Sequence, residues 1–272
     1  MIVLENEPLE EELVSIEIEC SKSVELLGIG LVSISGNIAN TIYKKGIGTG
    51  LLKTLVKFYK EQIIKKREGK IIDLLGSHTI YIHFFDVKPD IFTIFYVNEK
   101  DKLIRYDRLC SISNRLVKTF SSNSSNVDIN NICEKILPRV SGISALFIIS
   151  RGGHSLYTQI NDQKKFLMTN YIQIGGFLSA ITAFSQEVIG KDSGENLEEI
   201  NFQNHQFILN TKDNLIFAYL LEKNTNINQI KRFMELLAEE FIYSYHEQLE
   251  DFNGDIEPFT SFRHVVDKYF II

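Results

Sequence analysis

A glycine-rich stretch at residues 44–50, KKGIGTG, is the first candidate for chemistry in this 272-residue chain. Glycines that lead into a helix can cradle a phosphate group. The stretch lacks the Lys-Ser/Thr pair of a P-loop, and its spacing is not that of a dinucleotide fingerprint, although Asp73 stands near where a ribose-binding acid would be. We therefore favour a structural turn. A nucleotide-binding enzyme that uses Gly46, Gly48 and Gly50 for phosphate remains the less favoured alternative.

The histidines and cysteines form no recognisable site. His78 and His83 are five residues apart on one predicted strand, so their side chains point to opposite faces. The three cysteines lack any C-x-x-C pair and have apolar neighbours, which indicates small buried side chains rather than a disulfide or a metal site: Cys20, Cys110 and Cys133. We expect no metal, no cofactor and no catalytic set, and hence no enzyme.

A basic helix face is the second candidate. Residues 51–66 have an apolar stripe at helical spacing, formed by Leu51, Leu55, Tyr59 and Ile63. Lys53, Lys57 and Lys60 are expected opposite that stripe. They form a candidate docking face for an acidic partner or an anionic membrane surface. The competing interpretation is an ordinary solvated helix face.

The helix predicted at 176–188 has a different character. Its apolar residues are Phe177, Leu178, Ile181, Phe184 and Val188, and it is nearly uncharged before Glu187. We predict partner contacts at Phe177, Ala180, Ala183 and Phe184, because small uncharged residues permit close approach of another element. We expect the two halves of the chain to form a pseudo-twofold pair, with this helix at or near their contact. A homodimer is a further option.

Composition excludes several classes of protein. The chain carries a net charge of −6 and is 44% hydrophobic with 30 Phe and Tyr residues, so it has a core and is not disordered. Slight acidity argues against nucleic acid as a partner. We expect no membrane span and no signal peptide, and a cytoplasmic protein with peripheral membrane contact as a further option. Residues 1–12 contain five Glu, whereas residues 13–138 are net basic and 139–272 net acidic.

The elements occur in two copies of one order. In the first copy, hairpin strands are predicted at 28–35 and 38–44, a helix at 51–66, strands at 70–76, 78–85 and 91–97, and helices at 101–120 and 128–137. In the second copy, the corresponding segments are 145–150, 155–160, a helix opened by Gly175 and Gly176, strands at 197–202, 205–211 and 214–221, and helices after Asn226 and Pro258.

The fold class that follows is α+β, with two modules of order β-β-α-β-β-β-α-α. Each module should hold a five-stranded, mainly antiparallel sheet flanked by helices. We place the domains at 1–138 and 139–272. An alternating segment at 13–20 predicts an added edge strand in the first domain.

This order resembles the longin domain, a profilin-like module of the longin/roadblock group, which includes longin-like proteins of archaea. The resemblance is strongest at 145–160, 175–188 and 226–251. It implies a non-enzymatic tandem platform in membrane trafficking or GTPase regulation. The implied partners are a Ras-like small GTPase and other longin or roadblock modules. The resemblance also leaves open exchange-factor activity towards a small GTPase. The alternative from another class is a PAS- or GAF-like sensor whose strands 78–97 and 205–221 line a small-ligand pocket.

Overall fold

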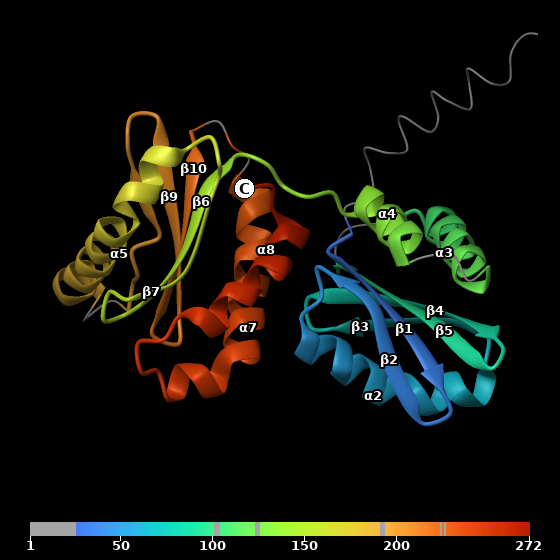
Figure 1. Ribbon diagram of the computed structural model, residues 1–272. Coiled ribbons are helices and arrows are strands. Elements are labelled where there is room, and N and C mark those ends of the chain that lie inside the picture. Colours follow the sequence, from blue (N-terminus) through green and yellow to red (C-terminus); the bar gives the residue numbers. More distant parts are fainter. Residues whose placement is uncertain (1–25, 101–103, 123–125, 191–193, 224, 226) are drawn as a thin grey trace, which may run out of the picture. The chain divides into compact units, whose positions relative to one another are not determined.

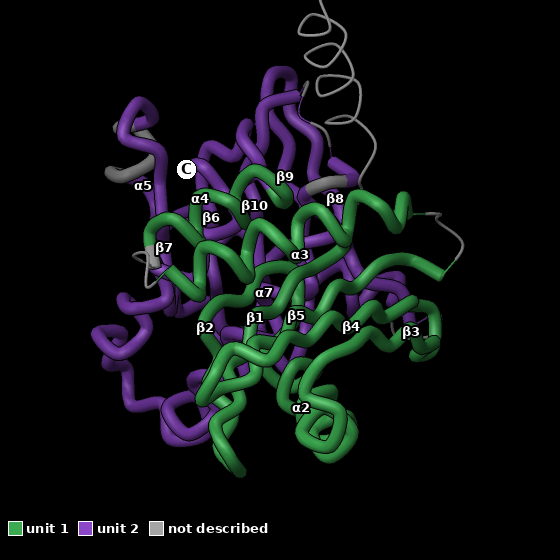
Figure 2. Tube along the Cα trace, turned by 90° about the vertical axis from the view of Figure 1, so that its right-hand side faces the viewer, with its two compact units in different colours: residues 1–137 green, residues 138–272 purple. Residues whose placement is uncertain are grey.

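The chain forms two compact units, residues 1–137 and 138–272, which are coloured separately in Figure 2. The computed structural model describes residues 26–100, 104–122, 126–190, 194–223, 225 and 227–272. Each unit holds one five-stranded antiparallel sheet with helices on both faces (Figure 1). The predicted fold class and the doubled element order are confirmed. The strand predicted at 13–20, Cys20 and Asn226 lie outside the described residues.

Unit 1 has the sheet order β2-β1-β5-β4-β3, so β2 and β3 are its edge strands. Its elements are β1 (Gly28–Ser35), β2 (Ile38–Lys45), α2 (Thr49–Lys66), β3 (Gly69–Leu75), β4 (His78–Val87), β5 (Asp90–Glu99), α3 (Tyr106–Ser121) and α4 (Asn126–Ile136). The predicted two-residue turn between β1 and β2 is confirmed, and Gly36 in it has a φ of 54°, which favours glycine.

Two apolar layers hold unit 1 together. Helix α2 covers one face of the sheet, and α3 with α4 covers the other (Figure 1). The central strand β5 is buried from Ile91 to Asn98 because it contributes side chains to both layers. Leu52, Leu55, Tyr59 and Ile63 are the buried residues of α2, so the predicted stripe is confirmed except that Leu52 replaces Leu51.

Unit 2 repeats the arrangement with the sheet order β7-β6-β10-β9-β8. Its elements are β6 (Ile143–Ser150), β7 (Ser155–Ile160), α5 (Lys165–Ser185), the π-helix η1 (Gln186–Gly190), β8 (Glu199–Asn201), β9 (His205–Lys212), β10 (Leu215–Glu222), α7 (Ile227–Glu250), the 3₁₀ helix η2 (Glu257–Phe262) and α8 (Arg263–Tyr269). Helix α5 covers one face of the sheet, and α7, η2 and α8 cover the other (Figure 1).

Helix α5 corrects two predictions. Gly175 and Gly176 do not open the helix, because α5 begins ten residues earlier at Lys165 and runs through both glycines. Glycine inside a helix costs only about 1 kcal/mol relative to Ala, which tertiary packing can outweigh. The predicted stripe is also not a single buried face: Leu178 is fully buried, whereas Phe177 and Phe184 are 45% and 68% exposed.

The length and composition of residues 170–190 would allow a membrane span, contrary to the expectation that no segment would qualify. Of this stretch, 17% is buried inside the structure. The same helix packs Leu178, Tyr171 and Ile174 against the sheet of unit 2, so one of its faces belongs to the core. Because this helix packs against the sheet of unit 2, we do not infer that it crosses a membrane.

Candidate functional site

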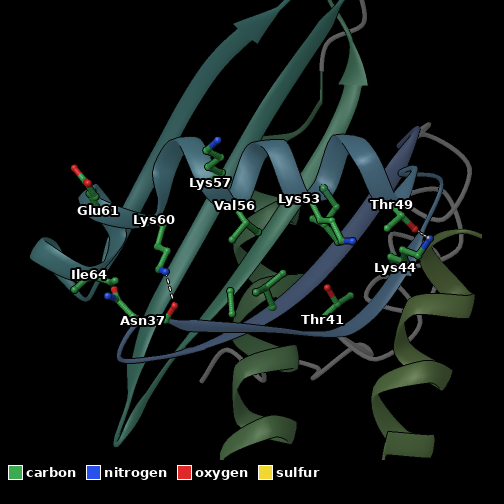
Figure 3. Close-up of a pocket in the computed structure, with 13 residues that line it drawn as sticks. Asn37, Thr41, Lys44, Thr49, Lys53, Val56, Lys57, Lys60, Glu61 and Ile64 are labelled. Atoms are coloured by element: carbon green, nitrogen blue, oxygen red, sulfur yellow. Dashed lines mark hydrogen bonds between the residues drawn. The ribbon is translucent and has the colours of Figure 1, made fainter. Parts of the chain in front are cut away.

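A groove of about 690 Å³ lies between helix α2 and the edge strand β2 of unit 1. Figure 3 shows it, with Lys60 and Val56 pointing from the helix toward the strand and Asn37 and Thr41 on the strand side. The lining consists of four lysines, one glutamate, three uncharged polar residues and five apolar residues: Val32, Asn37, Ala39, Thr41, Lys44, Thr49, Leu52, Lys53, Val56, Lys57, Lys60, Glu61 and Ile64.

The position of α2 follows from the loop that precedes it. Gly46 has a φ of 69°, and a Cβ atom there would lie 2.0 Å from the carbonyl oxygen of Leu27. Only glycine can adopt this conformation at such a close approach. Gly48 is the N-cap residue of α2, and Gly50 is in its first turn with open space around it. Of the glycines in 46–50, Gly46 is therefore required for the turn and for packing against Leu27. Because Gly175 and Gly176 lie inside α5, they are not an equivalent turn.

Two polar contacts attach α2 and the residue that follows it to strands β3 and β4. The Tyr59 hydroxyl donates a hydrogen bond to Asp73 on β3, and burial together with this carboxylate raises the pKa of Tyr59 to about 12. Asp73 is therefore engaged by Tyr59. At the end of the helix, Arg67 makes a bidentate pair with Asp86, and its hydrogen bonds hold the pKa of that carboxyl below its usual range. These contacts fix the helix that presents the lysines.

Strand alternation separates the two adjacent lysines of β2. Lys44 lines the groove, and its amino group donates a hydrogen bond to Thr49 Oγ1 at the start of α2 (Figure 3). Lys45 points to the other face of the sheet, is fully buried, and pairs with Glu134 of α4 at 2.9 Å between Nζ and Oε2. Lys45 therefore acts as a structural ion pair, and only Lys44 belongs to the groove.

Lys53, Lys57 and Lys60 lie along the side of α2 that faces the groove rather than diametrically opposite the buried stripe. All three line it, and Lys60 donates a hydrogen bond to the backbone carbonyl of Asn37 at the β1–β2 turn (Figure 3). With Lys44, they give the groove four positive charges against one negative charge from Glu61. Such a cluster attracts acidic groups, and the attraction weakens as salt is added.

The strand side of the groove suits an extended ligand. β2 is at the edge of its sheet, so among the described residues its outer row of backbone N–H and C=O groups has no neighbouring strand. The small side chains of Ala39 and Thr41 leave that edge accessible from the groove. Helical spacing in the sequence indicates the lysines of α2, but nothing in it points to Asn37 and Thr41. Residues 38–41 are all exposed in the structure, but the local sequence gives no signal that this strand lies at the edge of the sheet.

The partner residues predicted in unit 2 are on the surface of α5. Ala180 and Ala183 are exposed, as are Phe177 and Phe184, so the four side chains form one accessible apolar surface. This surface belongs to unit 2 and the lysine groove to unit 1. The two are distinct candidate surfaces.

Of the six histidines, only His83 has a buried side chain. His83 is buried on β4, where its Nδ1 lies 2.7 Å from Ser113 Oγ, and the Tyr96 hydroxyl is 2.8 Å from the same atom. Burial raises the pKa of the Cys133 thiol to about 12, so Cys133 is not a reactive thiolate. Within the described part of the chain, no group of three His, Cys, Asp or Glu side chains could hold a metal ion.

Comparison with known proteins finds a likeness among solved structures. No protein-family model matches the sequence, and no curated protein matches it. Among solved structures, the chain is similar to one described as the Crystal Structure of Roadblock/LC7 Domain from Streptomyces avermitilis. The identity is 10% and the TM-score 0.33, over 41% of this chain and 91% of that chain.

Proposed function

We propose that this chain is a non-enzymatic binding protein of the tandem longin-like kind, whose α2–β2 groove docks an acidic surface of a Ras-like small GTPase. The observation that supports this most directly is the cluster of four lysines beside an accessible sheet edge. The apolar floor of the groove, formed by Val32, Leu52 and Val56, can hold an apolar side chain of the partner. Charge then sets the rate and specificity of docking, and the floor adds buried area.

The small GTPase is proposed because of the resemblance in element order to longin modules. Other longin or roadblock modules and an anionic membrane surface are the remaining partners of this proposal. All would meet the protein in the cytoplasm or at the cytoplasmic face of a membrane. The sensor alternative receives less support, because Phe84, Phe95 and Tyr96, on the strands that would line its pocket, are fully buried in the core.

The test compares two triple variants with the same change in charge. The groove variant carries Lys53→Glu, Lys57→Glu and Lys60→Glu. The control carries Lys65→Glu, Lys66→Glu and Lys118→Glu, at exposed positions that do not line the groove. Exposed charge changes usually alter stability by less than about 0.5 kcal/mol each, so both variants should melt close to wild type.

Binding is measured against a purified Ras-like GTPase loaded with GDP or with a non-hydrolysable GTP analogue, at low and high salt. We expect the groove variant to lose binding and the control to retain it, and binding by wild type to weaken with salt. Equal binding by all three proteins would contradict the proposal. Binding of anionic vesicles in place of the GTPase would identify a membrane as the partner.

A thermal-shift measurement tests the enzyme alternative. A ligand that binds only the folded state raises the melting temperature by mass action. We expect stabilisation by the GTPase and none by ATP or NAD. Stabilisation by ATP or NAD alone, abolished by a bulky substitution at Gly48, would favour a nucleotide-binding enzyme instead.

A further inference from the structure

The chain enters unit 1 beside one end of the α2–β2 groove. Leu26, the first described residue, is fully buried, and the backbone N–H of Leu27 donates to the carbonyl of Val97 at 2.8 Å. β1 begins at Gly28, and Ile29 pairs with Lys45 at the end of β2. Residues before Leu26 are therefore attached next to the end of the groove that carries Lys44.

The residues attached there have the opposite charge to the groove. Residues 1–20 contain seven glutamates and no lysine or arginine. The groove contains four lysines and one glutamate. An acidic segment tethered beside a basic groove has a high effective concentration there, so even weak individual ion pairs can hold it in place.

We propose that residues 5–20 of the chain occupy its own α2–β2 groove, with residues 13–20 added as a strand along the outer edge of β2. The protein would thereby cover the surface that we assign to partner docking, and a partner would have to displace this segment. This inference deepens the proposed function and relies on it for the docking role of the groove.

The order of charges along the segment matches the order of lysines along the groove. Lys44 marks the end at which the chain enters, and Lys60, bound to the carbonyl of Asn37, marks the other end. A strand that leads into β1 from beside β2 runs parallel to β2. It would place Glu19 and Glu17 near Lys44, and the cluster Glu10, Glu11 and Glu12 toward the far end.

The two faces of the segment also match the two faces of β2. Ser15, Glu17 and Glu19 alternate with Val14, Ile16 and Ile18. Ala39 and Thr41 of β2 face the groove, whereas Ile42 packs against the opposite core layer. Ile38, which alternates with Ala39, is 65% exposed. An added strand with its glutamates toward the lysines would place its apolar side chains on the Ile38 side, where they would bury apolar surface.

The connecting residues are long enough for this placement. Residues 21–25 link the predicted strand to Leu26. Five extended residues span up to about 17 Å, whereas the position beyond β2 is two strand spacings, about 10 Å, from β1. The proposed strand can therefore reach its position without any change in unit 1.

Zero-length carbodiimide cross-linking of the full chain at high dilution tests the contact directly. The reagent joins a carboxylate to a lysine amine within ion-pair distance, as an amide. We expect products between Glu17 or Glu19 and Lys44 or Lys53, found in the monomer by mass spectrometry of peptides, and fewer of them in high salt.

Lysines elsewhere on unit 1 provide the internal control. Lys118 on α3 and Lys135 on α4 are exposed and do not line the groove. Cross-links from residues 5–19 spread equally over these lysines would overturn the inference. Products confined to covalent dimers would also overturn it, because they would place the segment in the groove of a second copy.

A peptide probe measures how far the groove is covered. The probe is a fluorescent peptide of residues 5–20, offered to wild type and to a full-length variant with Glu17→Gln and Glu19→Gln. If the segment covers the groove in about nine molecules of ten, freeing it tightens probe binding about tenfold. A control with Glu247→Gln and Glu250→Gln, at exposed positions on α7, should bind as wild type does. Equal binding by wild type and the Glu17/Glu19 variant would contradict the inference.

These results are distinguishable from those that test the proposed function. Loss of GTPase binding in the groove variant, without groove cross-links, would refute self-occupancy and leave the docking role standing. Groove cross-links in a protein that binds no GTPase would support self-occupancy and refute the proposed partner.

Discussion

His83 should make unit 1 less stable in mild acid. Its side chain is fully buried, with Nδ1 against Ser113, and Nε2 has no hydrogen-bond partner among the described residues. Burial, together with the nearby charge of Lys70, lowers the pKa of His83 from 6.5 to about 4. Protonation would place an uncompensated charge in the core, so the folded state resists it.

The size and direction of the effect follow from this difference in pKa. Between about pH 6.5 and pH 4 the unfolded chain binds a proton at this position and the folded chain does not, so stability falls as the pH falls. A full shift of this size corresponds to about 3 kcal/mol, most of which is lost by pH 4.5. Stability is unaffected by this group above the unfolded pKa.

The assay compares His83 with His83→Asn, which keeps a polar atom near Ser113 but does not titrate. The chain contains no Trp, so Phe120→Trp, in the half-buried ring stacked on Phe92, supplies a fluorescence signal from unit 1. Urea unfolding at about pH 7 and pH 4.5 should show that the His83 protein loses about 2–3 kcal/mol more of its unfolding free energy than the variant does. Carboxylates titrate in both proteins and cancel in the difference. Equal losses would refute the reasoning.

Two further predictions test how the elements are packed. Gly46→Ala should destabilise the chain by about 2 kcal/mol or more, because of its positive φ and the clash with Leu27, whereas Gly50→Ala, in the open first turn of α2, should be neutral or slightly stabilising. Leu178→Ala should cost about 2–4 kcal/mol and Phe184→Ser less than about 0.5 kcal/mol, because only the first is buried. Chemical denaturation measures the free energy of unfolding of each variant. An equal loss of stability for the two variants of either pair would contradict the assigned packing.

Much of the fold is predictable from local pattern. Alternation of apolar residues marks the strands, helical spacing marks α2 and α7, and glycine at positive φ marks the hairpin turns near Gly36 and Gly153. These signals arise from the sterics and side-chain directions of neighbouring residues, so they can be read in a short window of sequence. The doubled element order was accessible for the same reason.

The boundaries and faces of α5 were not predictable in that way. The sequence of α5 is apolar on two sides, and periodicity alone does not say which side meets a sheet. Contact with the sheet of unit 2 buries Leu178 and leaves Phe184 in solvent. The glycine pair suggested a start to the helix, but packing over its whole length outweighed the small cost of Gly175 and Gly176.

The groove is also a product of tertiary structure. By itself, the sequence determined that Lys53, Lys57 and Lys60 share one side of a helix, because that follows from helical spacing. The sheet order decided that β2 is an edge strand beside that helix, and strand alternation sent Lys44 into the groove and Lys45 into the core. Pairing of strands depends on contacts between residues far apart in the chain, and local sequence pattern does not encode which strand is left at the edge.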